Sequence, residues 1–265
     1  MNITSKILII STLALTLHSC NLFSAVGIGS QGQPIVEVTG ALNTTTQNSE
    51  VQVDHSLWDA LLKKYVNDEG IVDYKNFLNE RGKLKSYLQM LSVQHPTEAW
   101  SVEELLAYYI NTYNAYTVDL ILENYPVQSI KDIRGAWTKG IVPIGDETLS
   151  LGSVEHGVLR KMNEPRIHFA INCASYSCPK LLNEAFTADN MEEQLEKVTF
   201  EFINSDKNDI DAENPSLSSI FDWYEKDFKV NGKKNVIAYI NRYSNIKINS
   251  DAKIRYKEYD WNLNE

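Results

Sequence analysis

Hydrophobic positions in the first half of the chain recur every three or four residues, which is the spacing of one face of an α-helix. Two such faces precede residue 95, and their members are Leu57, Ala60, Leu61 and Tyr65, then Leu84, Tyr87, Leu88 and Leu91. A third and longer stretch opens with the capping box Ser101 and Glu104 and continues until Pro126. We expect this stretch to be the central helix.

The second half of the chain mixes strand and helix patterns. Residues 141–144 and 148–151 flank the turn residues Gly145 and Asp146 as a hairpin, and a short helix can start at Ser153. RIHFAIN (166–172) is interpreted as a buried strand, 189–202 and 235–243 as helices, and the tail 253–263 as a last strand. The predicted class is α+β, with a helical N-terminal half followed by a small, mostly antiparallel sheet and flanking helices.

The N-terminus predicts export. Residues 1–19 carry Lys6 and a short apolar run, and end in a small residue before Cys20, as a secretory signal does. Leu17, Ser19 and Cys20 stand where a bacterial lipobox has its aliphatic, small and cysteine positions, so the leader resembles that of a lipoprotein lipidated at Cys20. An ordinary secretory leader is the alternative. Asn21 after the cysteine favours the outer membrane over the inner one.

Composition divides the rest of the chain into two parts. Residues 20–53 are rich in Gly, Ser, Thr, Gln and Asn without hydrophobic periodicity, which predicts a flexible tether. Residues 54–265 fit one globular domain. The formal net charge is −10 and the 25 basic residues are scattered, which argues against a nucleic-acid partner. Contact with a lipid bilayer would come through Cys20.

Polar side chains on the predicted central helix need an explanation. Glu104, Asn111 and Asn114 share one face of a helix whose Tyr and Leu content predicts burial. An unpaired buried amide costs about 1 to 3 kcal/mol, so each asparagine should have a partner. The two asparagines either hold a crossing loop or contribute to a functional site.

Five motifs together resemble the DUF547 family, a domain of unknown function. They are LAYYINTYNAYTVDLIL, VEHGVLR, PRIHFAINCASYSCPKL, SIFDWYEKDF and YDWNLN, in this order over about residues 55 to 265. The resemblance assigns no activity. The most distinctive of its positions here are Asn111, Asn114, Glu155, His156, His168, Cys173 and the pair Cys178–Pro179.

The segment 154–180 could perform thiol chemistry. A nucleophilic Cys173 needs a base that forms the thiolate and a group that orients the base. On a straight strand His168 and Cys173 would face opposite ways, which favours His156 over His168 as the base. Glu104, Asn111 or Asn114 would orient the imidazole, in a layout distantly similar to papain-like and transglutaminase-like folds.

The predicted enzyme is thus a thiol-dependent hydrolase or acyl transferase. Its substrate would be an amide or thioester, either a small molecule or a peptide. Adjacent residues on a helix point about 100 degrees apart, so Glu155 is not expected to pair with His156.

The same residues allow two other interpretations. Cys173 and Cys178 could form a disulfide in an oxidising compartment and staple a non-catalytic binding module of the cell envelope, a bridge worth about 2 kcal/mol for so short a loop. His156, His168, Cys173 and Cys178 also have the donor types of a tetrahedral zinc site, although their spacing matches no zinc signature. No cofactor other than zinc is suggested.

Overall fold

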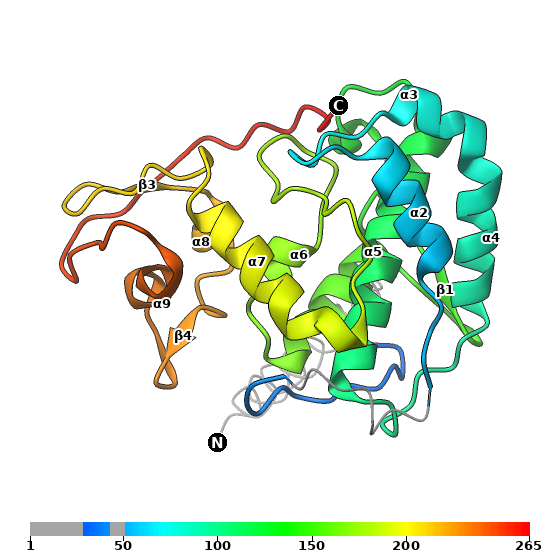
Figure 1. Ribbon diagram of the computed structural model, residues 1–265, viewed down its shortest axis with the longest axis horizontal. Helices are drawn as coiled ribbons and strands as arrows, with labels where there is room; N and C mark the ends of the chain where they lie inside the picture. Colours follow the sequence, from blue (N-terminus) through cyan, green and yellow to red (C-terminus); the bar gives the residue numbers. More distant parts are fainter. Residues whose placement is uncertain (1–28, 43–50) are drawn as a thin grey trace, which may run out of the picture.

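The computed structural model describes residues 29–42 and 51–265, and it is built around one long central helix (Figure 1). Helix α5 runs from Val102 to Asn124, and almost every side chain from Glu103 to Leu122 is buried. The Ser101 hydroxyl accepts a hydrogen bond from the Glu104 N–H at 3.1 Å, which satisfies one of the free donors at the helix start. The predicted central helix is confirmed.

Three shorter helices cover one side of α5. They are α2 (Ser56–Tyr65), α3 (Tyr74–Phe77) with the 3₁₀ turn η3 (Leu78–Glu80), and α4 (Arg81–Ser92). The predicted face of α4 is buried in full, whereas α2 buries Trp58, Leu61, Leu62 and Tyr65 and leaves the predicted Ala60 exposed. Trp58 on α2 stacks on Tyr87 of α4 with ring centroids 6.0 Å apart. The His55 Nδ1 lies 2.6 Å from the Tyr87 hydroxyl and adds a polar link between the same two helices.

A hairpin and a helical turn follow α5. The 3₁₀ turn η4 (Ile130–Asp132) leads to strands β1 (Val142–Ile144) and β2 (Glu147–Leu149), which pair antiparallel as predicted. The segment η5 (Ser153–Val158) is a π-helical turn that continues into the 3₁₀ turn η6 (Leu159–Met162). This is the short helix expected at Ser153, with a wider turn.

The prediction of a strand at residues 166–172 is wrong. Ile167–Ala170 form the one-turn helix α6, and the chain becomes extended at Ile171. The Asn114 side chain holds the end of this turn, because its Nδ2 donates to the Ala170 carbonyl at 3.0 Å and its Oδ1 accepts from the Asn172 N–H at 2.8 Å. A short apolar run cannot by itself distinguish a buried strand from a buried helical turn.

The remaining elements enclose the other side of α5. They are η7 (Ala188–Asn190), α7 (Met191–Ile203), β3 (Ser216–Leu217), α8 (Ile220–Trp223), β4 (Lys229–Val230), β5 (Lys233–Lys234), α9 (Val236–Tyr243) and β6 (Arg255–Tyr256). Strands β4 and β5 pair antiparallel, whereas β3 and β6 pair parallel. The α+β class is confirmed, with the described strands in two-stranded ladders.

The C-terminal tail is mostly extended but pairs with several segments in turn. After β6 its carbonyls accept from the N–H groups of Tyr176 and Ser177, and the Leu263 N–H donates to the Gln128 carbonyl. In Figure 1 the tail (red) crosses the molecule and ends beside α3. It therefore joins the two ends of the described domain.

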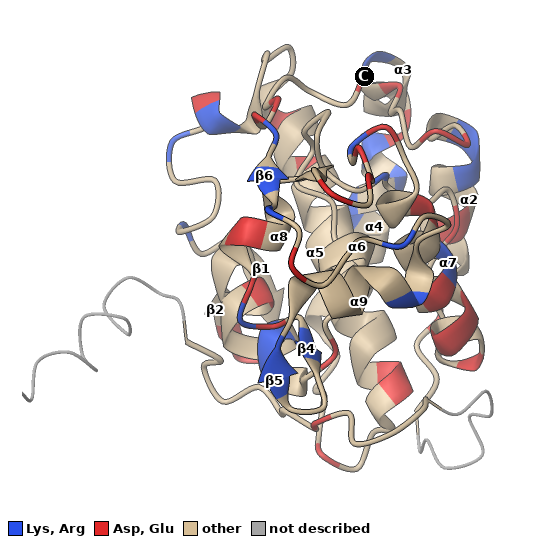
Figure 2. Ribbon diagram, turned by 90° about the vertical axis from the view of Figure 1, so that its left-hand side faces the viewer, with Lys and Arg blue, Asp and Glu red and all other residues tan. Residues whose placement is uncertain are grey.

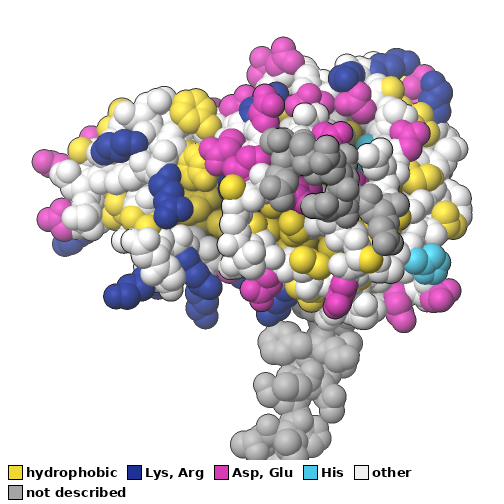
Figure 3. Space-filling view, turned by 60° about the horizontal axis from the view of Figure 1, so that its bottom comes forward, with side chains coloured by type: hydrophobic (Ala, Val, Ile, Leu, Met, Phe, Trp, Pro, Cys, Tyr) yellow, Lys and Arg dark blue, Asp and Glu magenta, His cyan; other side chains and the backbone are white. Residues whose placement is uncertain are grey.

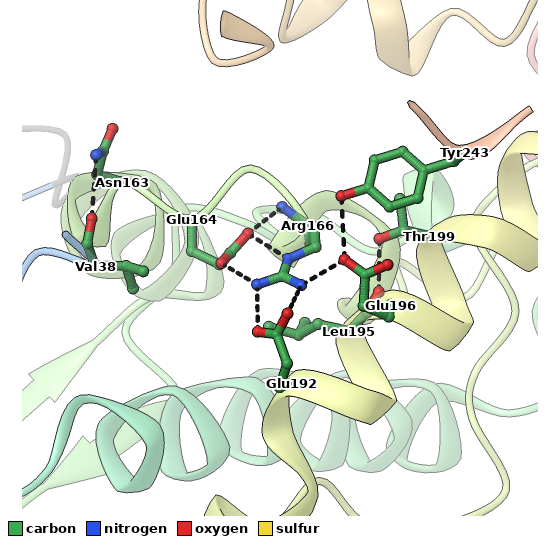
Figure 4. A network of polar contacts seen from close by, with 9 residues as sticks. All are labelled: Val38, Asn163, Glu164, Arg166, Glu192, Leu195, Glu196, Thr199 and Tyr243. Atoms are coloured by element: carbon green, nitrogen blue, oxygen red, sulfur yellow. Dashed lines mark hydrogen bonds and ion pairs between the residues drawn. The ribbon is translucent and has the colours of Figure 1, made fainter. Parts of the chain in front are cut away.

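The buried side chain of Arg166 ties the start of α6 to α7 (Figure 4). Its guanidinium donates to the carboxylates of Glu164, Glu192 and Glu196 at 2.7 to 2.9 Å. Tyr243 on α9 donates to Glu196 at 3.3 Å. This Arg166 network fixes the turn that carries His168.

Part of the predicted tether lies against the domain. Val38 and Leu42 are buried, and the Val38 N–H donates to the Met162 carbonyl at 2.8 Å. The predicted leader and Cys20 lie outside the described residues. Within 29–42 and 51–265, no helix is both long and apolar enough to cross a membrane.

Charges of both signs are interspersed along the chain. Figure 2 shows Lys and Arg beside Asp and Glu on several elements, with acidic residues prominent on α7. Hydrophobic side chains also reach the surface between charged ones, as Figure 3 shows. Among the larger ones, Trp223 is 47% exposed.

Candidate functional site

One pocket brings together four of the predicted site residues. It has a volume of about 290 Å³ and lies between α5, η5, the segment 171–179, α8 and the C-terminal tail. Its polar lining residues include Glu155, His156, His168, Cys173 and Cys178. The two histidines and two cysteines singled out from the sequence therefore face a common space.

The two cysteines are in contact. Both are free thiols, and their Sγ atoms are 2.9 Å apart. Cys173 is partly exposed, whereas Cys178 is buried and its Sγ also accepts a hydrogen bond from the Cys173 N–H. Two further hydroxyls approach the Cys173 Sγ, that of Ser175 at 3.2 Å and that of Tyr259 at 3.4 Å.

The turn after Cys173 has an unusual backbone conformation. Ala174 has a φ of +57°, a left-handed value that is strained for a residue with a Cβ. Asn172 holds this turn, because its Oδ1 accepts from the Ala174 N–H at 2.8 Å and its Nδ2 donates to the Pro179 carbonyl at 2.7 Å. Since such strain clusters at functional sites, the turn supports a role for Cys173.

The two thiols have opposite electrostatic surroundings. The hydrogen bond between the two thiols lowers the pKa of Cys173, and the Ser175 and Tyr259 hydroxyls act in the same direction, outweighing burial. Burial raises the pKa of Cys178 well above its usual value, and the neighbouring Cys173 raises it further. Of the two thiols, Cys173 is therefore the one that loses its proton more readily.

Glu155 is a buried carboxylate in the wall of the pocket. It accepts hydrogen bonds from the hydroxyls of Tyr224 at 2.5 Å and Tyr113 at 3.3 Å. Contrary to our expectation, Glu155 also approaches His156, with 3.6 Å between Oε1 and Nδ1. The expectation assumed regular α-helical spacing, whereas this segment is a π-helical turn. The His156 side chain is 37% exposed, so it is open to solvent and to the pocket.

His168 is held more firmly than His156. Its ring stacks on Tyr224 with centroids 4.0 Å apart, and its Nε2 lies 2.9 Å from the Asp227 Oδ2. Burial lowers the pKa of His168, against the opposing effect of Asp227. Burial alone would raise the pKa of Asp227, but hydrogen bonds from His168 and Arg160 hold it well below its usual value. The pair is a neutral imidazole beside a carboxylate.

The central-helix residues take different positions. Asn114 touches the backbone on both sides of Ile171, two residues before Cys173. Asn111 instead holds Phe186, with bonds to its N–H and its carbonyl at 3.1 and 2.7 Å. Glu104, at the start of α5, accepts from the Val53 N–H at 2.8 Å. None of these three residues is among those that line the pocket.

Aromatic side chains form most of the pocket wall. They come from α5, the loop before β1, α8 and the tail, and are Tyr113, Trp137, Trp223, Tyr224, Tyr259 and Trp261. Trp261 stacks on Trp223 and meets Trp137 edge to face, each with centroids 5.9 Å apart. Gly152 allows this arrangement, since a Cβ there would lie 2.7 Å from the Trp137 carbonyl oxygen.

A metal site is not assembled in the described part of the chain. Within it, no three His, Cys, Asp or Glu side chains are grouped so that they could hold a metal ion. His168 faces Asp227 and the two cysteines face each other, so the four candidate zinc ligands do not converge.

Four residues that bond to the polar groups of the pocket were not among the predicted site residues. Tyr113, Tyr224 and Tyr259 supply hydroxyls to Glu155 or Cys173, and Asp227 pairs with His168. All four lie within three of the DUF547-like motifs, and that position was the signal in the sequence by which they could have been found. Tyrosine is common in this chain, with 14 copies, so composition gave no reason to select these three.

Comparison with known proteins identifies the central part of the chain. Residues 97–203 match the model of the DUF547 family, described as a protein of unknown function. The matched range contains α5, both pocket histidines and both cysteines, but not Tyr224, Asp227, Tyr259 or Trp261. No curated protein and no solved structure matches the chain.

Proposed function

We propose that this protein is a thiol-dependent hydrolase or acyl transferase with Cys173 as its nucleophile. The observation that carries the proposal is the surrounding of the Cys173 Sγ, which has three hydrogen-bonding groups within 3.4 Å in a pocket: the Cys178 thiol and the hydroxyls of Ser175 and Tyr259. Hydrogen bonds to the charged form stabilise a thiolate, and the thiolate is the reactive species. The left-handed turn at Ala174 adds support.

The reaction would proceed through a thioester. The Cys173 thiolate attacks the carbonyl carbon of an amide or thioester, and the leaving group departs with a proton. Water or an acceptor amine or thiol then attacks the thioester and restores Cys173. His156 supplies and removes these protons, because its ring is partly exposed at the pocket and its Nδ1 is held by Arg160 at 3.3 Å, with Glu155 at 3.6 Å. His168 with Asp227 positions Tyr224, on which it stacks.

The pocket favours an acyl group with an apolar part. Most of its wall is aromatic, and its volume of about 290 Å³ suits a small acyl group or one peptide side chain. An aromatic wall binds flat or aliphatic surfaces by burial of apolar area. Longer substrates would extend over the exposed Trp223.

An activated acetate ester, 4-nitrophenyl acetate, tests the proposed nucleophile. Reduced protein should release nitrophenol in a burst and gain one acetyl group on Cys173, as peptide mass spectrometry would locate. Cys173→Ser should lose both. His156→Gln should keep the acetyl adduct but release it more slowly. Nitrophenol release that is unchanged in Cys173→Ser would overturn the proposal.

The second candidate is a non-catalytic binding module of the envelope stapled by a Cys173–Cys178 disulfide. The Sγ–Sγ separation of 2.9 Å favours it, because only a small movement brings the sulfurs to the bonding distance of about 2.05 Å. Alkylation without reductant distinguishes the two candidates. Protein from an oxidising compartment that resists alkylation and has lost two hydrogens contains the bridge and lacks the nucleophile.

The proposal also includes the location of the protein in the cell. Export by the leader and lipidation of Cys20 would place the pocket at a membrane surface of the envelope. Mass spectrometry of the mature N-terminal peptide checks this, since Cys20 should carry a lipid and residues 1–19 should be absent. A mature chain that starts elsewhere would contradict the anchor.

A further inference from the structure

We infer that the Cys173–Cys178 pair also reduces a small neutral aliphatic disulfide, with Cys173 as the attacking thiol and Cys178 as the resolving thiol. The inference rests on the proposed function in that both need Cys173 as a nucleophile. It adds an activity that an acyl transferase with a single cysteine would not have.

Geometry separates the two roles. Both cysteines line the pocket, but Cys173 is partly exposed whereas Cys178 is only 6% exposed. A disulfide that enters the pocket therefore meets Cys173 first. The 2.9 Å separation of the Sγ atoms then places Cys178 within reach of the mixed disulfide. The Cys178 N–H donates to the Ser175 carbonyl at 3.1 Å, which closes the loop that keeps the two sulfurs together.

The surroundings of the two thiols support the same order of events. A low pKa makes Cys173 the thiolate that attacks, and a high pKa keeps Cys178 protonated until the mixed disulfide has formed. In an acyl transferase the second thiol has no step to perform. Its contact with the nucleophile is explained when it resolves a covalent intermediate.

The exchange balances in two steps. The Cys173 thiolate attacks one sulfur of R–S–S–R′, an S–S bond forms to Cys173, and R′S⁻ leaves and takes a proton from water. Cys178 then loses its proton to water, attacks the Cys173 sulfur and releases RS⁻, which is protonated. The substrate gains two electrons and becomes two thiols, while the cysteine pair loses two electrons and becomes a disulfide. A thiol reductant such as dithiothreitol returns the pair for another round.

The pocket indicates the class of disulfide. Its walls are mostly aromatic, and its one acidic lining residue, Glu155, is already bonded to two tyrosine hydroxyls. Bis(2-hydroxyethyl) disulfide is neutral and aliphatic and is small enough for a pocket of about 290 Å³. A charged disulfide would lose its hydration against these walls without gaining an ion pair.

The test uses the reduced full-length chain, the probe bis(2-hydroxyethyl) disulfide, and mass spectrometry after acid quenching. Wild type should yield an internal Cys173–Cys178 disulfide and two equivalents of mercaptoethanol, with little mixed disulfide. Cys178→Ser and Cys178→Ala should hold a mixed disulfide at Cys173 that persists about tenfold longer or more, because the resolving thiol is gone. Cys173→Ser should form neither product.

The outcomes separate this inference from the proposed function. One outcome is that wild type becomes acetylated at Cys173 by 4-nitrophenyl acetate but, with bis(2-hydroxyethyl) disulfide, forms no internal disulfide and releases no mercaptoethanol. That result would refute disulfide reduction and leave acyl transfer standing. If Cys173 reacts with neither probe, it is not a nucleophile and both proposals fall. Folding of each variant is checked by circular dichroism, and the wild-type result decides alone if both Cys178 variants unfold.

Discussion

At the Cys173 sulfur, hydroxyl and thiol donors take the place of an imidazole. The Tyr259 hydroxyl lies 3.4 Å from this sulfur and accepts a hydrogen bond from the Ser175 hydroxyl at 3.1 Å, which leaves its own hydrogen for Cys173. No histidine of the described residues is within hydrogen-bonding distance of the Cys173 Sγ. The thiolate would therefore be formed by local donors, and the histidines would serve later steps.

Removal of the Tyr259 hydroxyl should make Cys173 less reactive. Tyr259→Phe keeps the ring in the aromatic wall but removes one donor, so the pKa of Cys173 should rise and iodoacetamide should label it several-fold more slowly at pH 7. Tyr256→Phe is the matched control, because Tyr256 is 38% exposed and does not line the pocket. Equal labelling rates in the two variants would contradict the role of Tyr259.

Two asparagines of α5 permit a paired experiment. Asn114→Ala and Asn111→Ala each leave one backbone N–H and one backbone carbonyl without a side-chain partner. Each should lower the free energy of unfolding by about 2 to 4 kcal/mol, measured with urea. Asn114→Ala alone should slow the alkylation of Cys173, because only Asn114 holds the segment that carries it. Similar alkylation rates in both variants would show that the Asn114 contacts do not position the thiol.

The sequence identified Cys173, His156 and His168, because cysteine and histidine are rare here and lie in dense motifs. It could not assign Tyr259 and Asp227 to the pocket, since they are 86 and 59 residues from their partners in the chain. Contacts of that separation depend on the path of the chain. Local spacing carries no information about them.

Among the elements, α2 and α4 are linked by a histidine that makes the fold sensitive to acid. Burial lowers the pKa of His55 to about 4, against a small opposing effect of Asp54. The unfolded chain has a histidine pKa of about 6.5, so as the pH falls it binds the proton first. The stabilisation is complete above pH 6.5 and is lost progressively as the pH falls towards 4, by about 3 kcal/mol in all.

His55→Gln should flatten this dependence. Glutamine does not titrate, so the unfolding free energy should change less between pH 7 and pH 4 than it does in wild type, as urea unfolding at several pH values would show. His95→Gln is the control, because His95 is exposed. An equal loss of stability on acidification in wild type and His55→Gln would rule out His55 as the sensitive group.

The Arg166 network should be the most sensitive ionic contact between elements. Arg166→Ala leaves Glu164 buried with a charge and without its partner, so the unfolding free energy should fall by about 3 to 5 kcal/mol. The exposed ion pair of Lys63 with Asp59 is the comparison, and Lys63→Ala should cost less than about 1 kcal/mol. Thermal and urea unfolding measure both. Similar losses would mean that the network does not hold α6 against α7.

The elements that could be predicted were those with a strong local signal. The sequence of α5 has the capping-box residues Ser101 and Glu104, of which only the Ser101 cap forms, and a stop at Pro126. The hairpin has Gly145 at a φ of +57° in its turn. The residues of α6 carry an apolar run that fits a strand equally well. Its helical turn is fixed by Asn114 and by the Arg166 network, neither of which is local in sequence.

For the whole molecule, the C-terminal tail decides whether there is a pocket. Tyr259 and Trp261 complete the aromatic wall, and Asn264 then bonds to the Gly70 carbonyl at 3.1 Å near the start of the domain. The sequence predicted a last strand, but not that the strand would cross from α8 to α3. The tail thus completes the pocket and also ties it to the first helices of the described domain.

That Cys173 is a reactive thiol with a lowered pKa can be measured directly, as the rate of its alkylation at different pH values. The reduced full-length protein is treated with iodoacetamide between pH 5 and 10, and Cys173 and Cys178 are followed as separate peptides. Because the pKa of Cys173 is lowered, Cys173 should label with a midpoint clearly below the ordinary thiol value of about 8.5. Cys178, whose pKa is raised, should label slowly at every pH. A Cys173 midpoint at or above the ordinary thiol value would contradict this lowered pKa.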